Sequence, residues 1–196
     1  MICMRQILCT LLSLCFVFAL QAQDCQELFI SEYVEGSGFE KYIEVYNPTG
    51  SDVDLSNYQL RLYSNGASSP NTTTTLSGTL ASGEVMVYRN SSATGYPSAT
   101  VASAVNFNGD DAIELYNTST MMAADIFGNI GNDPGSQWTG GGNGTANQTL
   151  RRNSSVSGGV TTDPNGMGAS SFTTLGTEWT NSATNDVSGL GSHTSD

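Results

Sequence analysis

The chain is built from short runs of β-branched and aromatic residues, each closed within a few positions by Gly, Asn, Asp or Pro. No stretch carries the amphipathic period of a long helix. This pattern predicts antiparallel strands joined by turns. A chain with this number of short strands typically packs them as two facing sheets. We therefore expect an all-β sandwich. Strands are expected at residues 28–34, 41–46, 53–63, 84–89, 112–116 and 121–127.

Composition agrees with this interpretation. The chain contains 25 Ser, 22 Thr, 22 Gly and 16 Asn, whereas only 12% of its residues are charged. Exposed helices need long and charged side chains, so helices are not favoured. Hydrophobic residues at 38% and aromatic residues at 9% are sufficient for a core. A length of 196 residues suits one domain.

From residue 128 onward the pattern changes to a long, mostly irregular segment dense in Gly, Asn and Ser. Two tryptophans, Trp138 and Trp179, interrupt it. Because large aromatic side chains favour burial, we expect this segment to wrap around the sandwich and pack on it. Residues 64–79 and 140–148 are expected to be exposed loops.

The first 22 residues have the pattern of an export signal. Arg5 precedes a stretch free of charge at 7–20, and Leu20-Gln21-Ala22 offers a small residue at the cleavage position. The apolar stretch is shorter than the roughly 20 residues of a membrane helix, and no second one follows. We expect signal peptide 1–22, a single domain 23–196, no membrane span, and a secreted protein, either extracellular or periplasmic.

Removal of the signal changes the cysteine count and the charge. Cys25 alone remains, so no intrachain disulfide can form, and whether this thiol is free or pairs with another chain stays open. Five basic residues then face 18 acidic ones, a formal charge of −13. Such an acidic protein disfavours nucleic acid and favours cations, neutral glycans or basic proteins as partners, although acidity also serves solubility alone.

The single histidine, His193, excludes a site built from several histidines and makes a Ser-His-Asp triad improbable near the end of the chain. Carboxylates are the abundant chemical groups. Asp110 and Asp111 follow Asn108-Gly109 at the entry to a strand and are candidate Ca²⁺ ligands, together with Glu32, Glu35 and Glu44. The alternative is a turn followed by solvated carboxylates. Asp163, in a turn sequence, is a weaker candidate.

Three further groups have two interpretations each. Glu32 and Glu44 are either an acid and base on paired strands or cross-strand neighbours of Lys41 and Arg61. The Arg151-Arg152 pair (151–152) either grips an anion or pairs with the acids of the chain. The tyrosines either form a platform for sugars or belong to the core; they are Tyr33, Tyr42, Tyr46, Tyr58, Tyr63, Tyr88 and Tyr116.

Several separated blocks, taken in order, resemble the lamin tail domain family. Residues 28–33, 41–50 and 53–60 are similar to the opening of that domain, and 109–116 to a later strand. The rest of the chain resembles the bacterial secreted branch of this family at residues 125–128, 133–138, 149–152, 178–179 and 190–193.

The resemblance implies an immunoglobulin-like β-sandwich, here with a long irregular C-terminal segment packed on it. It also implies a binding or interaction module rather than an enzyme, because no residues remain for a catalytic domain. No cofactor is expected apart from the candidate Ca²⁺. The ligand expected is a protein or a glycan that the sequence does not identify. The alternative is an accessory subunit that targets a separate secreted hydrolase, a nuclease or phosphatase, to its substrate.

Overall fold

The computed structural model describes residues 27–196. The predicted signal peptide and Cys25 lie outside the described residues.

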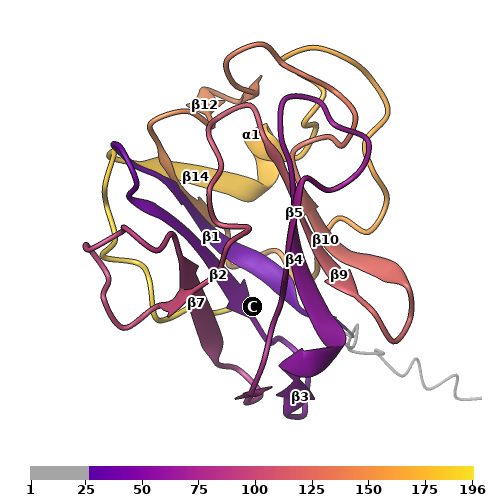
Figure 1. The fold of residues 1–196 in the computed structure, drawn as a ribbon, viewed down its shortest axis with the longest axis vertical. Coiled ribbons are helices and arrows are strands. Elements are labelled where there is room, and N and C mark those ends of the chain that lie inside the picture. Colours follow the sequence, from indigo (N-terminus) through magenta and orange to yellow (C-terminus); the bar gives the residue numbers. More distant parts are fainter. Residues whose placement is uncertain (1–26) are drawn as a thin grey trace, which may run out of the picture.

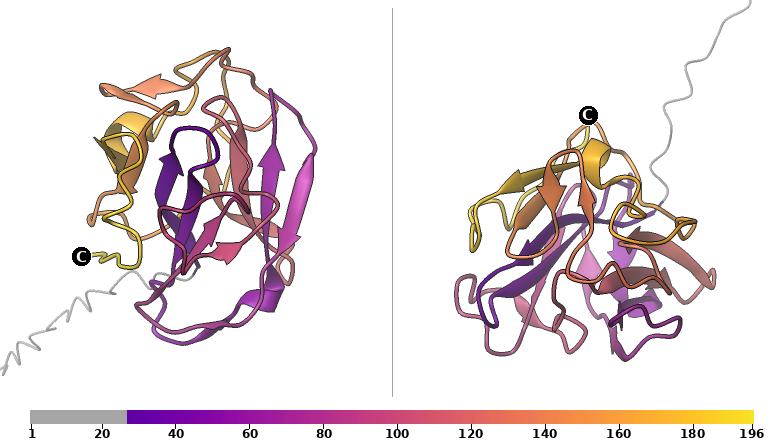
Figure 2. Two further views of the ribbon diagram at one scale, coloured as in Figure 1. Left: turned by 60° about the vertical axis from the view of Figure 1, so that its left-hand side comes forward. Right: turned by 90° about the horizontal axis from the view of Figure 1, so that it is seen from above.

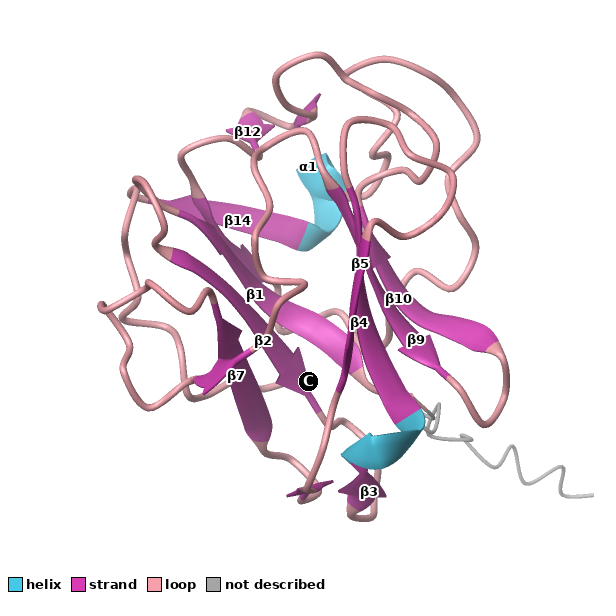
Figure 3. Cartoon of the chain, in the orientation of Figure 1, coloured by secondary structure: helices cyan, strands magenta, loops and turns pink. Residues whose placement is uncertain are grey.

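Two β-sheets face each other (Figures 1 and 3). The larger sheet has the strand order β14-β13-β1-β2-β7-β8, and the smaller has the order β10-β9-β4-β5. The bounds of the larger sheet are β1 Phe29–Glu35, β2 Lys41–Tyr46, β7 Val85–Arg89, β8 Thr100–Val101, β13 Thr149–Arg152 and β14 Trp179–Ser182. Those of the smaller are β4 Tyr58–Tyr63, β5 Thr72–Thr75, β9 Ala112–Asn117 and β10 Met122–Phe127.

Short elements complete the fold. Two small pairs are β3 with β6 and β11 with β12, and the helical turns are η1 and α1. Their bounds are β3 Val53–Asp54, β6 Thr79–Leu80, β11 Thr139–Gly140, β12 Asn143–Gly144, η1 Leu55–Asn57 and α1 Leu175–Glu178. No helix of the described residues is long and apolar enough to cross a membrane.

The main core fills the space between the sheets. Tyr33 of β1 stacks on Phe107 and Phe127, with ring centroids 4.7 and 4.2 Å apart. Aliphatic residues such as Ile43 and Leu115 surround these rings and are fully buried. Stacked aromatic rings add to the free energy gained from burying apolar area, so this cluster holds the two layers together.

A second, smaller core covers the outer face of the larger sheet. Val34 and Tyr42 pack there against Leu190 of the C-terminal segment and Ala93 of the loop after β7. Figure 2 shows the C-terminal segment, in yellow, along the outside of this sheet. Both faces of β1 and β2 are therefore covered, and every residue of these strands is buried.

The structure confirms the all-β sandwich and most of the expected strands, and it corrects two details. Trp138 and Trp179 are buried at 0% and 4% exposure, as expected for a packed C-terminal segment. That segment is less irregular than predicted, because its β13 and β14 extend the larger sheet beside β1. The two expected loops are not only loop: in 64–79 the threonine-rich β5 pairs with β4, and in 140–148 β12 pairs with β11 and Thr145 is buried. A run of four threonines satisfies β propensity but lacks the apolar alternation by which strands are usually found.

Candidate functional site

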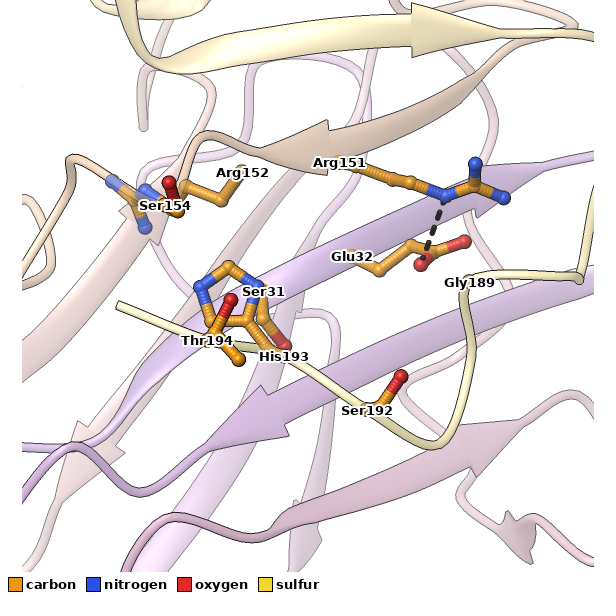
Figure 4. A pocket seen from close by; sticks show the side chains of 9 residues that line it. All are labelled: Ser31, Glu32, Arg151, Arg152, Ser154, Gly189, Ser192, His193 and Thr194. Carbon is orange, nitrogen blue, oxygen red and sulfur yellow. Dashed lines mark ion pairs between the residues drawn. The ribbon is translucent and has the colours of Figure 1, made fainter. Parts of the chain in front are cut away.

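A polar pocket of about 260 Å³ lies on the outer face of the larger sheet, between β1, β13 and the C-terminal segment (Figure 4). Its charged walls are Glu32, Arg151 and Arg152, and the C-terminal segment contributes His193. Serine and threonine hydroxyls complete the lining.

A β-bulge in β1 places the side chain of Glu32 in this pocket. Strand alternation from Leu28 and Ile30, both in the main core, would place residue 32 in the core as well. The register between β1 and β2 shifts between Ile30 and Glu32, and Tyr33 takes the core position instead. The extra residue at Ser31 thus turns the carboxylate of Glu32 to the outer face.

Glu32 is a buried acid with incomplete pairing. Its side chain is 3% exposed, Oε2 lies 3.3 Å from Nε of Arg151, and Oε1 has no hydrogen-bond partner. Burial raises its pKa to about 7, against the pull of Arg151, and the charge of Glu44 raises it further. Glu32 therefore keeps its proton close to neutral pH.

Glu44 is the cross-strand partner of Glu32 and is also buried. Its carboxylate accepts hydrogen bonds from the hydroxyl of Ser31, at 2.7 Å, and from the backbone N–H of Gly191, at 2.6 Å. Burial raises its pKa despite these bonds. The bond to Gly191 fixes the C-terminal segment over the two acids.

Arg151 joins Glu32 to the C-terminal segment. Its guanidinium also pairs with Asp186 at 3.0 Å. Hydrogen bonds from Ser182 and Ser188 hold the pKa of Asp186 well below its usual range, so this acid stays ionised. Arg151 is about one third exposed, which makes it the accessible cation of the pocket.

Arg152 points the other way and is buried. It forms ion pairs with Asp125, on β10 of the other sheet, and with Glu178 at 2.6 Å, and its side chain is 1% exposed. Its guanidinium also lies over the ring of Trp179, 4.9 Å from the centroid. Because Asp125 belongs to the smaller sheet, this pair links the two layers.

His193 is held by aromatic rings rather than by polar partners. Its ring meets Phe29 and Tyr46 edge-on, with centroids 5.6 and 4.8 Å apart, and its Nε2 is buried without a hydrogen-bond partner. Burial and the charge of Arg152 lower its pKa, which favours the neutral ring.

The structure decides between several alternatives left open by the sequence. Glu32 and Glu44 do lie together, but their expected partners Lys41 and Arg61 pair elsewhere, with Glu35 and with Glu114. Lys41 is the first residue of β2, and Arg61 lies on β4 of the smaller sheet.

The Arg151-Arg152 pair (151–152) binds acids of the chain itself, which supports the second interpretation. The acids that complete these pairs, Asp125, Glu178 and Asp186, were not predicted as site residues. Asp125 is the only charged residue of β10, a strand that is otherwise apolar. A charged residue in an apolar strand indicates a buried ion pair, and this pattern could have identified Asp125 from the sequence.

Asp110 and Asp111 are buried and immediately precede β9 of the smaller sheet. Asp111 accepts backbone N–H bonds from Asn65 and Asn108, each at 3.0 Å, so its two oxygens organise turns. One oxygen of Asp110 is buried without a partner, and burial raises its pKa. Within residues 27–196, no group of three or more His, Cys, Asp or Glu side chains is arranged to hold a metal ion.

The third candidate Ca²⁺ ligand, Asp163, accepts a hydrogen bond from the backbone N–H of Ile130 at 2.8 Å. The Ca²⁺ ligands therefore remain a prediction, now with two of the three carboxylates engaged by backbone.

The tyrosines support the structural interpretation over a sugar platform. Six of them are buried, and four of these donate a hydroxyl hydrogen bond inside the protein: Tyr33 to the carbonyl of Thr145 at 3.2 Å, Tyr63 to Glu114 at 2.6 Å, Tyr42 to Glu40 and Tyr58 to Glu27. The hydroxyl of Tyr88 is buried without a partner. The seventh, Tyr116, carries the guanidinium of Arg61 on its ring, 3.4 Å from the centroid.

A comparison with protein-family models identifies the family of this chain. The family model of the Lamin Tail Domain matches residues 21–129, more than half of the chain. The chain belongs to the lamin tail domain family. This is a family of non-catalytic, immunoglobulin-like domains, which agrees with the two-sheet architecture. No curated protein matches the chain.

The family match ends before β13 and β14, yet these strands complete the larger sheet. The pocket thus forms where the matched region meets the segment that follows it.

Proposed function

We propose that this chain is an exported lamin-tail module of the bacterial secreted branch, non-catalytic, that binds a partner at or outside the cell envelope. The observation that carries the proposal is that both arginines of the pocket are held by acidic side chains of the chain itself. Arg152 is enclosed by Asp125 and Glu178, and Arg151 bridges Glu32 and Asp186. Acids and bases committed to ion pairs stabilise a fold more readily than they transfer protons.

The single domain 23–196 is part of the same proposal. β13 lies between β14 and β1 in one sheet, so the residues beyond the family match share hydrogen bonds with the residues inside it. A module of this kind binds through its surface, and its formal charge of −13 after removal of the signal favours neutral or basic ligands.

Export is tested by expressing the full chain with a C-terminal tag and measuring the mass of the protein outside the cytoplasm. A mature product that begins at Gln23 is expected. The matched control lacks residues 2–22 and should stay in the cytoplasm. Retention of the full-length mass inside the cell contradicts the proposal.

Catalysis is tested with nuclease, phosphatase and glycosidase substrate panels, with and without Ca²⁺. We expect no turnover. Turnover that is lost in Glu32→Gln or Glu44→Gln would show that the pocket is an active site and would replace the binding proposal by a hydrolase.

A further inference from the structure

A second pocket, of about 370 Å³, lies at the β8 edge of the larger sheet. The turn between β1 and β2 contributes Phe39, the loop after β7 contributes Ser91 and Ser92, and β8 with the residues after it contributes Val101 and Asn106. Its volume falls within the range of about 300–1,000 Å³ that is usual for sites of small ligands.

Two large apolar side chains of this pocket face solvent. Phe39 is 61% exposed and Val101 is 50% exposed, whereas the other phenylalanines of the described residues are buried. Neither side chain contributes to the two cores. Because both side chains line one pocket, a ligand that fills it would remove their apolar area from water.

The turn that carries Phe39 is fixed in place. The neighbouring Glu40 accepts hydrogen bonds from the backbone N–H groups of Thr94, at 2.9 Å, and Gly95, at 3.0 Å. It also accepts one from the hydroxyl of Tyr42 at 2.5 Å. The ring is thus presented on a braced turn, and little conformational entropy is lost when a ligand stacks on it.

The opposite wall is braced by Arg89. Its guanidinium donates to the carbonyl oxygens of Ser91 at 3.2 Å, Ala93 at 3.0 Å and Ala99 at 3.1 Å. These hydrogen bonds hold the loop after β7 in place, and they occupy the guanidinium of Arg89. The pocket itself contains no ionisable side chain.

Amide and hydroxyl groups supply the polar part of the pocket. Asn90 is buried and donates to the side-chain oxygen of Asn106 at 3.0 Å, which fixes the amide plane of Asn106 and leaves its N–H donors for a ligand. Ser91 and Ser92 are exposed beside it. A neutral lining in a strongly acidic protein disfavours anions and gives a cation no partner.

We propose that this pocket binds a neutral oligosaccharide, with the apolar face of one pyranose ring on Phe39 and its hydroxyls on Asn106 and the adjacent serines. The inference rests on the proposed binding function and names its ligand class. An exposed ring beside fixed amide and hydroxyl groups complements a sugar, which has an apolar face and a rim of hydroxyls.

The test is isothermal titration calorimetry of the exported chain with hexasaccharides of cellulose, xylan, mannan, chitin and laminarin type. At least one is expected to bind, with affinity reduced about tenfold or more by Phe39→Ala and retained by Phe39→Trp. Asn106→Ala should also weaken binding. The matched control is Met121→Ala, which removes another exposed apolar side chain, 75% exposed, from a different strand connection.

Each other outcome overturns the inference. Binding of none of the hexasaccharides at millimolar concentration does so, as does binding that Phe39→Ala leaves unchanged, or preference for an anionic oligosaccharide such as oligogalacturonate. Self-association or capture of a peptide strand at β8 that depends on Phe39 would show that the surface serves protein contacts. In that last case the binding function stands and only the sugar is wrong.

Discussion

Glu32 and Glu44 face each other across β1 and β2, and the C-terminal segment covers both carboxyl groups. Two like charges in a buried site cannot both ionise without cost, and Arg151 contacts only one of them. The pKa of each is raised, chiefly by burial. The pair therefore binds a proton that the unfolded chain releases at lower pH.

Stability should fall as this proton is lost. The folded-state pKa of Glu32 is about 7 and its ordinary value is 4.5, so the free energy of unfolding falls as pH rises from about 4.5 to 7. Glu32→Gln removes this titration. Relative to the wild type, the variant should gain about 2 to 3 kcal/mol between pH 5 and pH 8, measured by urea unfolding.

The control is Glu84→Gln, which removes an exposed carboxylate outside the pocket. If the difference between Glu32→Gln and the wild type changes with pH no more than that of the control, Glu32 is not the group that lowers stability as pH rises.

The buried Arg152 provides a second prediction. Arg152→Met leaves Asp125 buried without its cation, because that carboxylate is otherwise bound by backbone N–H groups of Ile30 and Val160. We expect a loss of about 3–5 kcal/mol in the free energy of unfolding. The double variant with Asp125→Asn should recover part of it.

Arg61→Met serves as the control for this prediction, because the ion pair of Arg61 with Glu114 is partly exposed and should cost no more than about 1 kcal/mol. Equal losses for Arg152→Met and Arg61→Met in chemical unfolding would contradict the proposed link between the sheets.

Much of the sandwich was predictable from sequence because its strands follow simple alternation. In β2, Ile43 and Val45 face the main core and Tyr42 the outer core, as the period of two predicts. The bulge at Ser31 was not predictable, since one extra residue changes the phase of a strand without changing its composition.

The pocket was predictable only in its parts. The sequence singled out Glu32 and Glu44 as acids within strands and Arg151 and Arg152 as a double arginine, but their grouping depends on β13 pairing with β1, more than 100 residues away. No local pattern specifies such a long-range pairing. Phe39 drew no attention because an isolated aromatic residue in a turn becomes informative only once its exposure is known.

Calcium remains the third prediction. If Asp110 and Asp111 bind Ca²⁺, 5 mM CaCl2 should raise the melting temperature by about 2–4 °C, the shift expected for a millimolar site. The rise should vanish in the Asp110→Asn, Asp111→Asn double variant. Because Asp111 also accepts backbone bonds, each variant is compared with itself in EDTA, and MgCl2 serves as the ion control. No rise in the wild type would end the prediction.

The fourth prediction concerns the contact by which the C-terminal segment closes the pocket. A Cβ added at Gly189 would overlap Nε of Arg151 and Oε2 of Glu32, whereas one added at Gly158 meets nothing within 4 Å. Gly189→Ala should therefore displace the segment and cost about 1–3 kcal/mol in urea unfolding, and Gly158→Ala should stay within about 0.5 kcal/mol of the wild type. Because the displaced segment admits water to Glu32, the Gly189 variant should also lose part of the pH dependence between pH 5 and pH 8. A variant as stable as the wild type, with an unchanged pH profile, would show that the segment does not seal the acids.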